Sequence, residues 1–471
     1  MSDPALSDPD DLGGQLRVTP AGTVVVSTDA LLASADRLRS LEAALHGDVR
    51  RVIIADSVAT GMPIDGIVPA LERLRARCEG ARDAFGRIAE DYTRTEAAIE
   101  RAQRDLAAMI AAAVGPAVFG ALMRLILFCP GALIAGALLG WAAIPDGPDG
   151  RLGTVRDFMI AHPELITSPE FVRFVSLVAT SIDDAVLGGI GVPSWLVALP
   201  GLDLSPDGGV AAGALTVAAM GAMLGMFRET PVSVDRVSTQ ALNVAPAGVR
   251  ERLDNIPEGD QIRIEKYEAE GMPPRYTVSV GPTETFSPYA DQEPFDSTSN
   301  TYGVAGLSAG SFRAVELAMA EAGIRPGDEV VLTGFSQGGL VATMVAASGD
   351  WNVVGLETHG APAGNIPLPS GIAGMAIRNT DDLVPALAGP QFEHDLMQVE
   401  RRAFREGVDI PTVQAAPAHQ RTGYEGTASA IDRAESSAVQ QQIRTLDAFA
   451  ADYLERPGGH ATVMMYHATR D

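Results

Sequence analysis

The pattern of apolar and polar residues changes near residue 260. From there to the C-terminus, short apolar runs alternate with helical stretches, which is typical of a mostly parallel sheet with helices on both faces. The first two runs alternate with period two across a Gly- and Pro-containing turn, so they predict a hairpin at the edge of that sheet. The expected strands are 262–267, 275–280, 330–335, 352–358, 372–378 and 397–404, with a terminal strand at 461–466.

Before residue 230 the apolar spacing is helical. Apolar side chains recur at helical spacing over 31–45 and again over 64–109, which predicts two antiparallel helices. Two almost uncharged runs follow at 106–144 and 208–227, each near the length of a membrane span, about 20 residues. They predict either a buried helix pair or segments that enter a bilayer, and the sequence leaves both open.

Proline and small polar residues separate these regions. The first residues repeat Ser-Asp-Pro, which is typical of disorder, and Pro231, Pro246 and Pro257 predict a linker. The fold class is therefore α/β, preceded by an all-α domain. The expected organisation is a disordered N-terminus at 1–24, a helical hairpin at 25–107, an apolar helical region at 108–230, a linker at 231–259 and an α/β domain at 260–471.

One stretch of the α/β half has the features of a catalytic turn. The strand-like run at 330–335 leads into a G-x-S-x-G motif at 334–338, and small apolar residues of helical character follow. Glycines flank a serine in this way where a strand turns sharply into a helix and the backbone passes close to its neighbours. The serine hydroxyl then lies at a helix N-terminus, which favours an oxyanion. We therefore expect Ser336 to be a nucleophile, with a plain glycine-rich turn as the alternative.

A serine hydroxyl needs a base to take its proton and an acid to hold that base. In enzymes with this turn the chain order is Ser, then Asp or Glu, then His, each after the C-terminal end of a strand. Two aspartates follow the predicted strand that leads to Asn379, and we prefer Asp382 over Asp381 as the acid. An acidic turn that caps the strand is the alternative.

Three motifs in this order resemble those of the α/β-hydrolase superfamily. The segment 357–365 resembles the T-F-G-x-P-x-x-G-N of class 3 lipases, and 379–385 resembles their N-D-x-V-P, whose Asp aligns with Asp382. The G-F-S-Q-G turn is closer to cutinases and acyl-protein thioesterases. The resemblance implies a C-terminal α/β-hydrolase fold with a lipase-type triad. His359 stands where the family has an aromatic residue, so we interpret it as structural.

Several histidines after Asp382 compete for the role of base. His419 lies in the loop after the predicted strand 397–404, with an aromatic residue shortly after it as in related lipases, and it is our first choice. His394 precedes that strand and is expected at the wrong end of the sheet. His460 precedes the terminal strand and remains the second choice, and His467 lies within or just after that strand.

Two backbone N–H groups are expected to hold the oxyanion. The first is that of Gln337, which follows the serine, and the second belongs to the loop after an earlier strand. The strand 275–280 ends at the right place, and because Pro282 has no N–H, Thr283 is the expected donor. Its hydroxyl can assist. The Thr-, Ser- and Pro-rich residues 284–303 are expected to form the rim of the site.

Composition narrows the possible partners. Lys+Arg 35 against Asp+Glu 60 gives a net charge of -25, which argues against nucleic acid and against electrostatic docking on anionic lipid. Cys78 and Cys129 show no metal-ligand spacing, and ester hydrolysis by a triad needs no metal or cofactor. The first residues lack the basic and apolar regions of a secretory signal peptide. The expected partner is an ester or lipid substrate.

The predicted hairpin carries a second resemblance. Tyr92 and Glu96 lie four residues apart on one helical face, and this Y-x-x-x-E resembles the signal of small type VII secretion substrates, over about 25–105. The turn between the helices is long and lacks the family's Trp-x-Gly, and a surface tyrosine on a charged helix is the alternative. The resemblance implies a secretion-machinery or helical partner. Membrane association, export without a classical signal peptide and a cytoplasmic location all stay open.

The sequence thus predicts a serine esterase or lipase behind a helical domain that localises it. Two alternatives belong to other classes. One is a catalytically silent scaffold that retains the hydrolase fold, because a fold alone does not establish a function. The other is an effector that type VII secretion delivers and that acts on membrane lipids.

Overall fold

The computed structural model describes residues 14–19, 159–180, 225–287, 289–389, 396–412 and 414–471, with scattered positions within 73–82 and 211–222. The predicted hairpin with Tyr92 and Glu96 lies almost entirely outside these residues. So do the apolar run 106–144 and much of 208–227. The chain divides into two compact units, residues 24–115 and residues 1–23 with 116–471.

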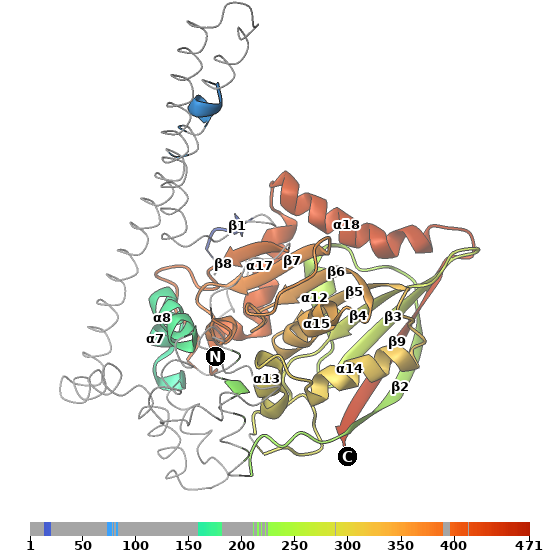
Figure 1. The fold of residues 1–471 in the computed structure, drawn as a ribbon, viewed down its shortest axis with the longest axis horizontal. Helices are drawn as coiled ribbons and strands as arrows, with labels where there is room; N and C mark the ends of the chain where they lie inside the picture. Colours follow the sequence, from blue (N-terminus) through green and yellow to red (C-terminus); the bar gives the residue numbers. More distant parts are fainter. Residues whose placement is uncertain are drawn as a thin grey trace, which may run out of the picture. The chain divides into compact units, whose positions relative to one another are not determined.

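Nine strands of the described residues form one mixed sheet in the order β1-β8-β7-β6-β5-β4-β3-β9-β2 (Figure 1). Neighbouring strands from β4 to β8 run parallel, so their carboxyl ends meet at one edge of the sheet. The other pairs are antiparallel. The strands are β1 (Arg17–Thr19), β2 (Val232–Leu242), β3 (Ile262–Glu268), β4 (Arg275–Val280), β5 (Glu329–Phe335), β6 (Asn352–His359), β7 (Ala373–Asn379), β8 (Met397–Arg401) and β9 (His460–Arg470).

Helices cover both faces of the sheet (Figure 1). The side chains of strand β5 divide between the two faces. Val330 and Leu332 pack in the cluster that includes α14 (Gly310–Glu321) and α15 (Gln337–Ser348). Val331, between them, packs against α18 (Ser437–Leu454) on the other face. Successive side chains of a strand point to opposite faces, so a strand covered on both sides is apolar throughout.

The face that carries α18 is completed by two more helices. Buried side chains of α12 (Gly248–Asp254) and α17 (Arg421–Asp432) form one cluster with residues of β7 and β8. Shorter helices lie between the strands: α13 (Ser297–Val304), α16 (Leu383–Ala386) and the 3-10 helix η1 (Pro417–His419). From the helical region, α7 (Pro163–Ile166) precedes α8 (Pro169–Thr180), and α8 contacts α16.

The stretch 231–259 differs from the expected linker because it belongs to the sheet. It contains β2, which pairs with β9, and α12, whose Val249 and Leu253 are fully buried. The residues of β2 are all exposed or half-buried, since β2 is an edge strand with one neighbour. Such a strand shows little apolar pattern, and its flanking prolines mark the ends of structure rather than a linker.

Two further expectations about the sheet need correction. The hairpin of β3 and β4 exists, but it lies inside the sheet, because the C-terminal strand β9 inserts between β3 and β2. At the opposite edge, residues 17–19 form β1 against β8, although the segment 1–24 was expected to be disordered. Both errors concern pairings between residues far apart in the sequence, which local patterns do not specify.

None of the helices within the described residues is both long enough and apolar enough to cross a membrane.

Candidate active site

Ser336 occupies the sharp turn between β5 and α15. It is the N-cap of α15, with φ 55° and ψ -122°, a backbone conformation that costs energy for any residue other than glycine. The turn is held on both sides. The N–H of Ser336 donates to the carbonyl of His359 at 2.8 Å, and its own carbonyl accepts from the N–H of Leu340 at 3.1 Å. The strained conformation is therefore stabilised by the end of β6 and by the first turn of α15.

The glycines of the motif are required by contacts of the backbone. A Cβ on Gly334 would lie 2.3 Å from the carbonyl carbon of Gly338, and a Cβ on Gly338 would lie 2.0 Å from the carbonyl oxygen of Val280. No side chain fits at such distances. The second contact also shows that the end of β4 touches the first turn of α15, which brings the loop with Thr283 toward Ser336.

The structure brings Ser336, His419 and Asp382 together. Nε2 of His419 lies 2.8 Å from Oγ of Ser336, and Nδ1 of His419 lies 2.7 Å from Oδ2 of Asp382. An ionised carboxylate only accepts, so Nδ1 carries the proton and Nε2 accepts from the serine hydroxyl. Each follows the carboxyl end of a strand: Ser336 follows β5, Asp382 follows β7 and His419 follows β8.

The other histidines lie elsewhere. His460 is paired with Glu268, at the end of β3 that is remote from Val280, and its side chain is 63% exposed. This places it at the opposite edge of the sheet from Ser336. His467 lies on β9 beside Asp235 of β2. His394 is outside the described residues.

The two adjacent aspartates have different partners. Asp382 is the N-cap of α16, and its Oδ1 accepts from the N–H of Val384 at 2.9 Å while Oδ2 faces His419. Asp381 points away and accepts from the N–H groups of Ala403 and Phe404 at 2.7 and 2.9 Å. Burial raises the pKa of Asp381 to about 6. Asp381 thus anchors the chain after β8, and only Asp382 contacts the histidine.

The imidazole of His419 is held in position by its surroundings. The ring of Phe335 stacks on it at a centroid distance of 5.3 Å. The amide Nδ2 of Asn379 donates to the carbonyl of Ala418 at 3.0 Å and so fixes η1. Sequence reasoning did not assign these roles. Asn379 lies three residues before Asp382, and when N-D-x-V-P is aligned on Asp382 its Asn position falls on Asp381, so the motif did not mark the Asn379 amide.

The expected oxyanion donors lie on two segments that meet at the turn. Gln337 is the first residue of α15, so its N–H has no carbonyl partner within the helix. Its side chain is buried, and Nε2 donates to the carbonyl of Asp296 at 2.9 Å. The hydroxyl of Thr283 accepts from Nδ2 of Asn300 at 2.9 Å. Both donors are therefore connected to α13, which begins directly after Asp296.

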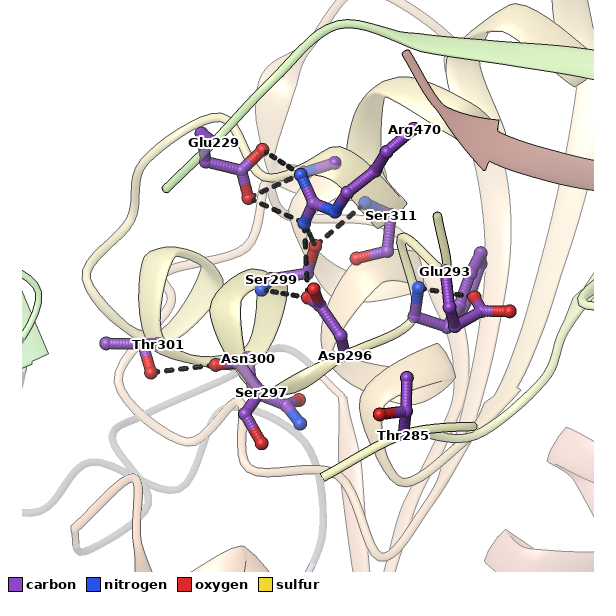
Figure 2. Close-up of polar contacts among 12 residues, drawn as sticks. Glu229, Thr285, Glu293, Asp296, Ser297, Ser299, Asn300, Thr301, Ser311 and Arg470 are labelled. Carbon is purple, nitrogen blue, oxygen red and sulfur yellow. Dashed lines mark hydrogen bonds and ion pairs between the residues drawn. The ribbon is translucent and has the colours of Figure 1, made fainter. Parts of the chain in front are cut away.

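Figure 2 shows how a buried ion-pair network anchors α13. Asp296 accepts from the N–H of Ser299 at 2.8 Å and from Nη2 of Arg470 at 3.1 Å. Arg470 also donates to Glu229 at 2.9 and 3.1 Å, and Arg313 donates to the same carboxylate. Burial opposes ionisation of Glu229, but the hydrogen bonds from the two arginines lower its pKa. The predicted rim, 284–303, is thus largely a structural segment tied to the last strand.

His359 has the structural place that was expected for it. Its side chain is fully buried, and Nε2 lies 3.3 Å from Oε1 of Glu357. Glu357 in turn accepts from Arg252 of α12 at 2.7 Å. Apart from its backbone carbonyl, which holds Ser336, and an edge contact with the Tyr424 ring, His359 takes no part in the site.

Comparisons with protein-family models, with curated proteins and with solved structures found no match. What the site can do is therefore inferred from its own geometry. A serine hydroxyl faces an imidazole nitrogen that can accept its proton, and a buried carboxylate faces the other nitrogen. This arrangement activates a serine for attack on an electrophilic carbon.

Proposed function

We propose that this protein is a serine hydrolase of esterase or lipase type, built on an α/β-hydrolase fold. The observation that carries the proposal is the continuous chain of contacts from Ser336 through His419 to Asp382, at 2.8 and 2.7 Å. Three features support it: the strained serine after a parallel strand, the glycines that the turn requires, and the chain order Ser, Asp, His.

The proposed reaction has two steps. Oγ of Ser336 attacks the ester carbonyl while Nε2 of His419 takes its proton, and the carbonyl oxygen becomes an oxyanion that accepts from the N–H groups of Gln337 and Thr283. Collapse breaks the ester bond, and His419 returns the proton to the leaving alcohol. Water then attacks the acyl-enzyme by the same route and releases the acid. Asp382 stabilises the imidazolium in both steps.

The proposal is tested by active-site labelling of the purified full-length protein with a fluorophosphonate. We expect covalent modification at Ser336, identified by peptide mapping, and no modification of a Ser336→Ala variant. His460→Ala provides the matched control and should label at the normal rate, because His460 lies at the opposite edge of the sheet. Absence of labelling in the wild type would favour a silent scaffold and refute the proposed function.

A further inference from the structure

Tyr424 of α17 reaches the carboxylate that faces His419. Its hydroxyl donates to Oδ2 of Asp382 at 2.7 Å, and the same oxygen lies 2.7 Å from Nδ1 of His419. The hydroxyl also accepts from the N–H of Asn379 at 3.1 Å. Oδ2 of Asp382 thus accepts hydrogen bonds from both the phenol of Tyr424 and the imidazole of His419. The phenol is itself held by the N–H of Asn379 in β7.

The ring of Tyr424 is enclosed by the aromatic residues of the site. It is fully buried and lies edge-on to Phe335 at 5.5 Å and to His419 at 6.2 Å between centroids. A Cβ on Gly360 would lie 2.8 Å from the Tyr424 hydroxyl, so the glycine after β6 leaves the space that the phenol needs. These contacts enclose the ring on several sides while its hydroxyl bonds to Asp382.

The phenol acts as a hydrogen-bond donor over the whole useful pH range. Burial and the charge of Asp382 raise the pKa of Tyr424 well above its usual value, so the hydroxyl keeps its proton. The other titratable groups around the phenol and His419 are Asp381 in the β7–α16 turn and His359, with its partner Glu357, on β6. None of these donates a hydrogen bond to Asp382 in the described part of the chain.

A donor on the carboxylate changes what the carboxylate does to His419. The phenol takes up part of the negative charge of Oδ2 and prevents rotation of the carboxylate about its bond. Because Oδ2 also faces Nδ1 of His419 at 2.7 Å, a carboxylate held in one orientation keeps the imidazole ring directed at Ser336.

We propose that Tyr424 is a positioning residue, which holds the carboxylate of Asp382 and through it sets the orientation of His419. The proposal rests on the proposed function, in which His419 is the base. Within the described residues the hydroxyl of Tyr424 bonds to Asp382 and Asn379, so the effect of the hydroxyl on the reaction passes through the carboxylate.

The test compares Tyr424→Phe with Tyr453→Phe in the full-length protein. Tyr453 is the matched control, because it is also buried and its hydroxyl also makes a 2.7 Å bond, to the carbonyl of Pro273 far from the site. We expect Tyr424→Phe to lower kcat for a p-nitrophenyl ester about 10-fold with little change in KM. A lower kcat at nearly constant KM is the result that a loss of stability alone would not give. Tyr453→Phe should change stability alone.

Two outcomes decide between this proposal and the proposed function. If the wild type hydrolyses the ester but Tyr424→Phe has an unchanged kcat, the positioning role is wrong. If the wild type neither hydrolyses esters nor labels with a fluorophosphonate, the proposed function fails. In that case the NMR signal of the Nδ1–H proton of His419, assigned with His419→Ala, still tests the contact. A changed chemical shift in Tyr424→Phe supports the proposal, and an unchanged one overturns it.

Discussion

Glu229 and Arg470 lie 241 residues apart in the sequence and are joined by two hydrogen bonds of 2.9 and 3.1 Å. The guanidinium of Arg470 lies between this carboxylate and that of Asp296, and its side chain is 2% exposed. Arg470 of β9 therefore joins the segment before β2 to the N-terminus of α13.

Removal of that cation should destabilise the protein strongly. Arg470→Met leaves the buried carboxylate of Asp296 without its cation and Glu229 with Arg313 alone, and we expect the free energy of unfolding to fall by about 3–5 kcal/mol. Arg236→Met is the control, because Arg236 pairs with Glu321 at the surface and such pairs contribute about 0–1 kcal/mol. Urea unfolding measures both. Equal losses in the two variants would show that burial of the network adds nothing.

The same network places the boundary of the α/β half before β2. We expect a fragment of residues 225–471 to fold and to melt cooperatively, and a fragment of residues 260–471 to be molten or insoluble. The shorter fragment lacks β2, which pairs with β9, and α12, which supplies the buried Val249 and Leu253. Circular dichroism melts decide the matter. A cooperative melt of the 260–471 fragment would restore 231–259 to the role of a linker.

Loss of either Ser336 or His419 should abolish hydrolysis. We expect Ser336→Ala to lower kcat by roughly 10⁴–10⁶, His419→Ala to be nearly as inactive, and the double variant to be no worse, because the members of a triad act as a unit. His460→Ala should keep most activity. Steady-state kinetics with p-nitrophenyl esters provide the measurement. An inactive His460 variant beside an active His419 variant would reverse the assignment of the base.

Gly338 should tolerate no side chain. A Cβ there would lie 2.0 Å from the carbonyl oxygen of Val280, so Gly338→Ala must displace either β4 or α15. We expect a loss of ester hydrolysis together with a lower melting temperature. Gly327→Ala is the control, since nothing lies within 4 Å of a Cβ at that position. Normal activity of Gly338→Ala would show that the contact between β4 and α15 is not needed.

Asp381 should make stability depend on pH. Its pKa rises from 3.8 to about 6 on folding, so the carboxylic acid form is favoured by the fold. The contribution is fully present below pH 3.8 and is lost as the pH rises through about 6. We compare the free energy of unfolding of the wild type with that of Asp381→Asn. The difference should fall by about 3 kcal/mol as the pH rises from below 3.8 to above 6. Urea unfolding at several pH values measures this difference, and a constant difference would contradict the raised pKa.

Local patterns predicted the elements that carry the site. Apolar runs and motif spacing predicted the strand before Ser336, the position of Asp382 after β7 and the loop with His419. A parallel strand that is buried on both faces must be apolar throughout, so it is easily recognised in the sequence. The pairing of β9 with β2 and the bond from Arg470 to Asp296, 174 residues apart, were not predictable in this way. Such contacts depend on strand order, which no local pattern encodes.

The position of β9 has a consequence for the synthesis of the protein. The strand is made after both of its neighbours, β3 and β2, so the sheet is complete only when residues 460–470 have left the ribosome. Until then both neighbours present unpaired backbone groups, the kind of edge that attracts other chains. A chain that stops before residue 460 should therefore aggregate rather than fold partly.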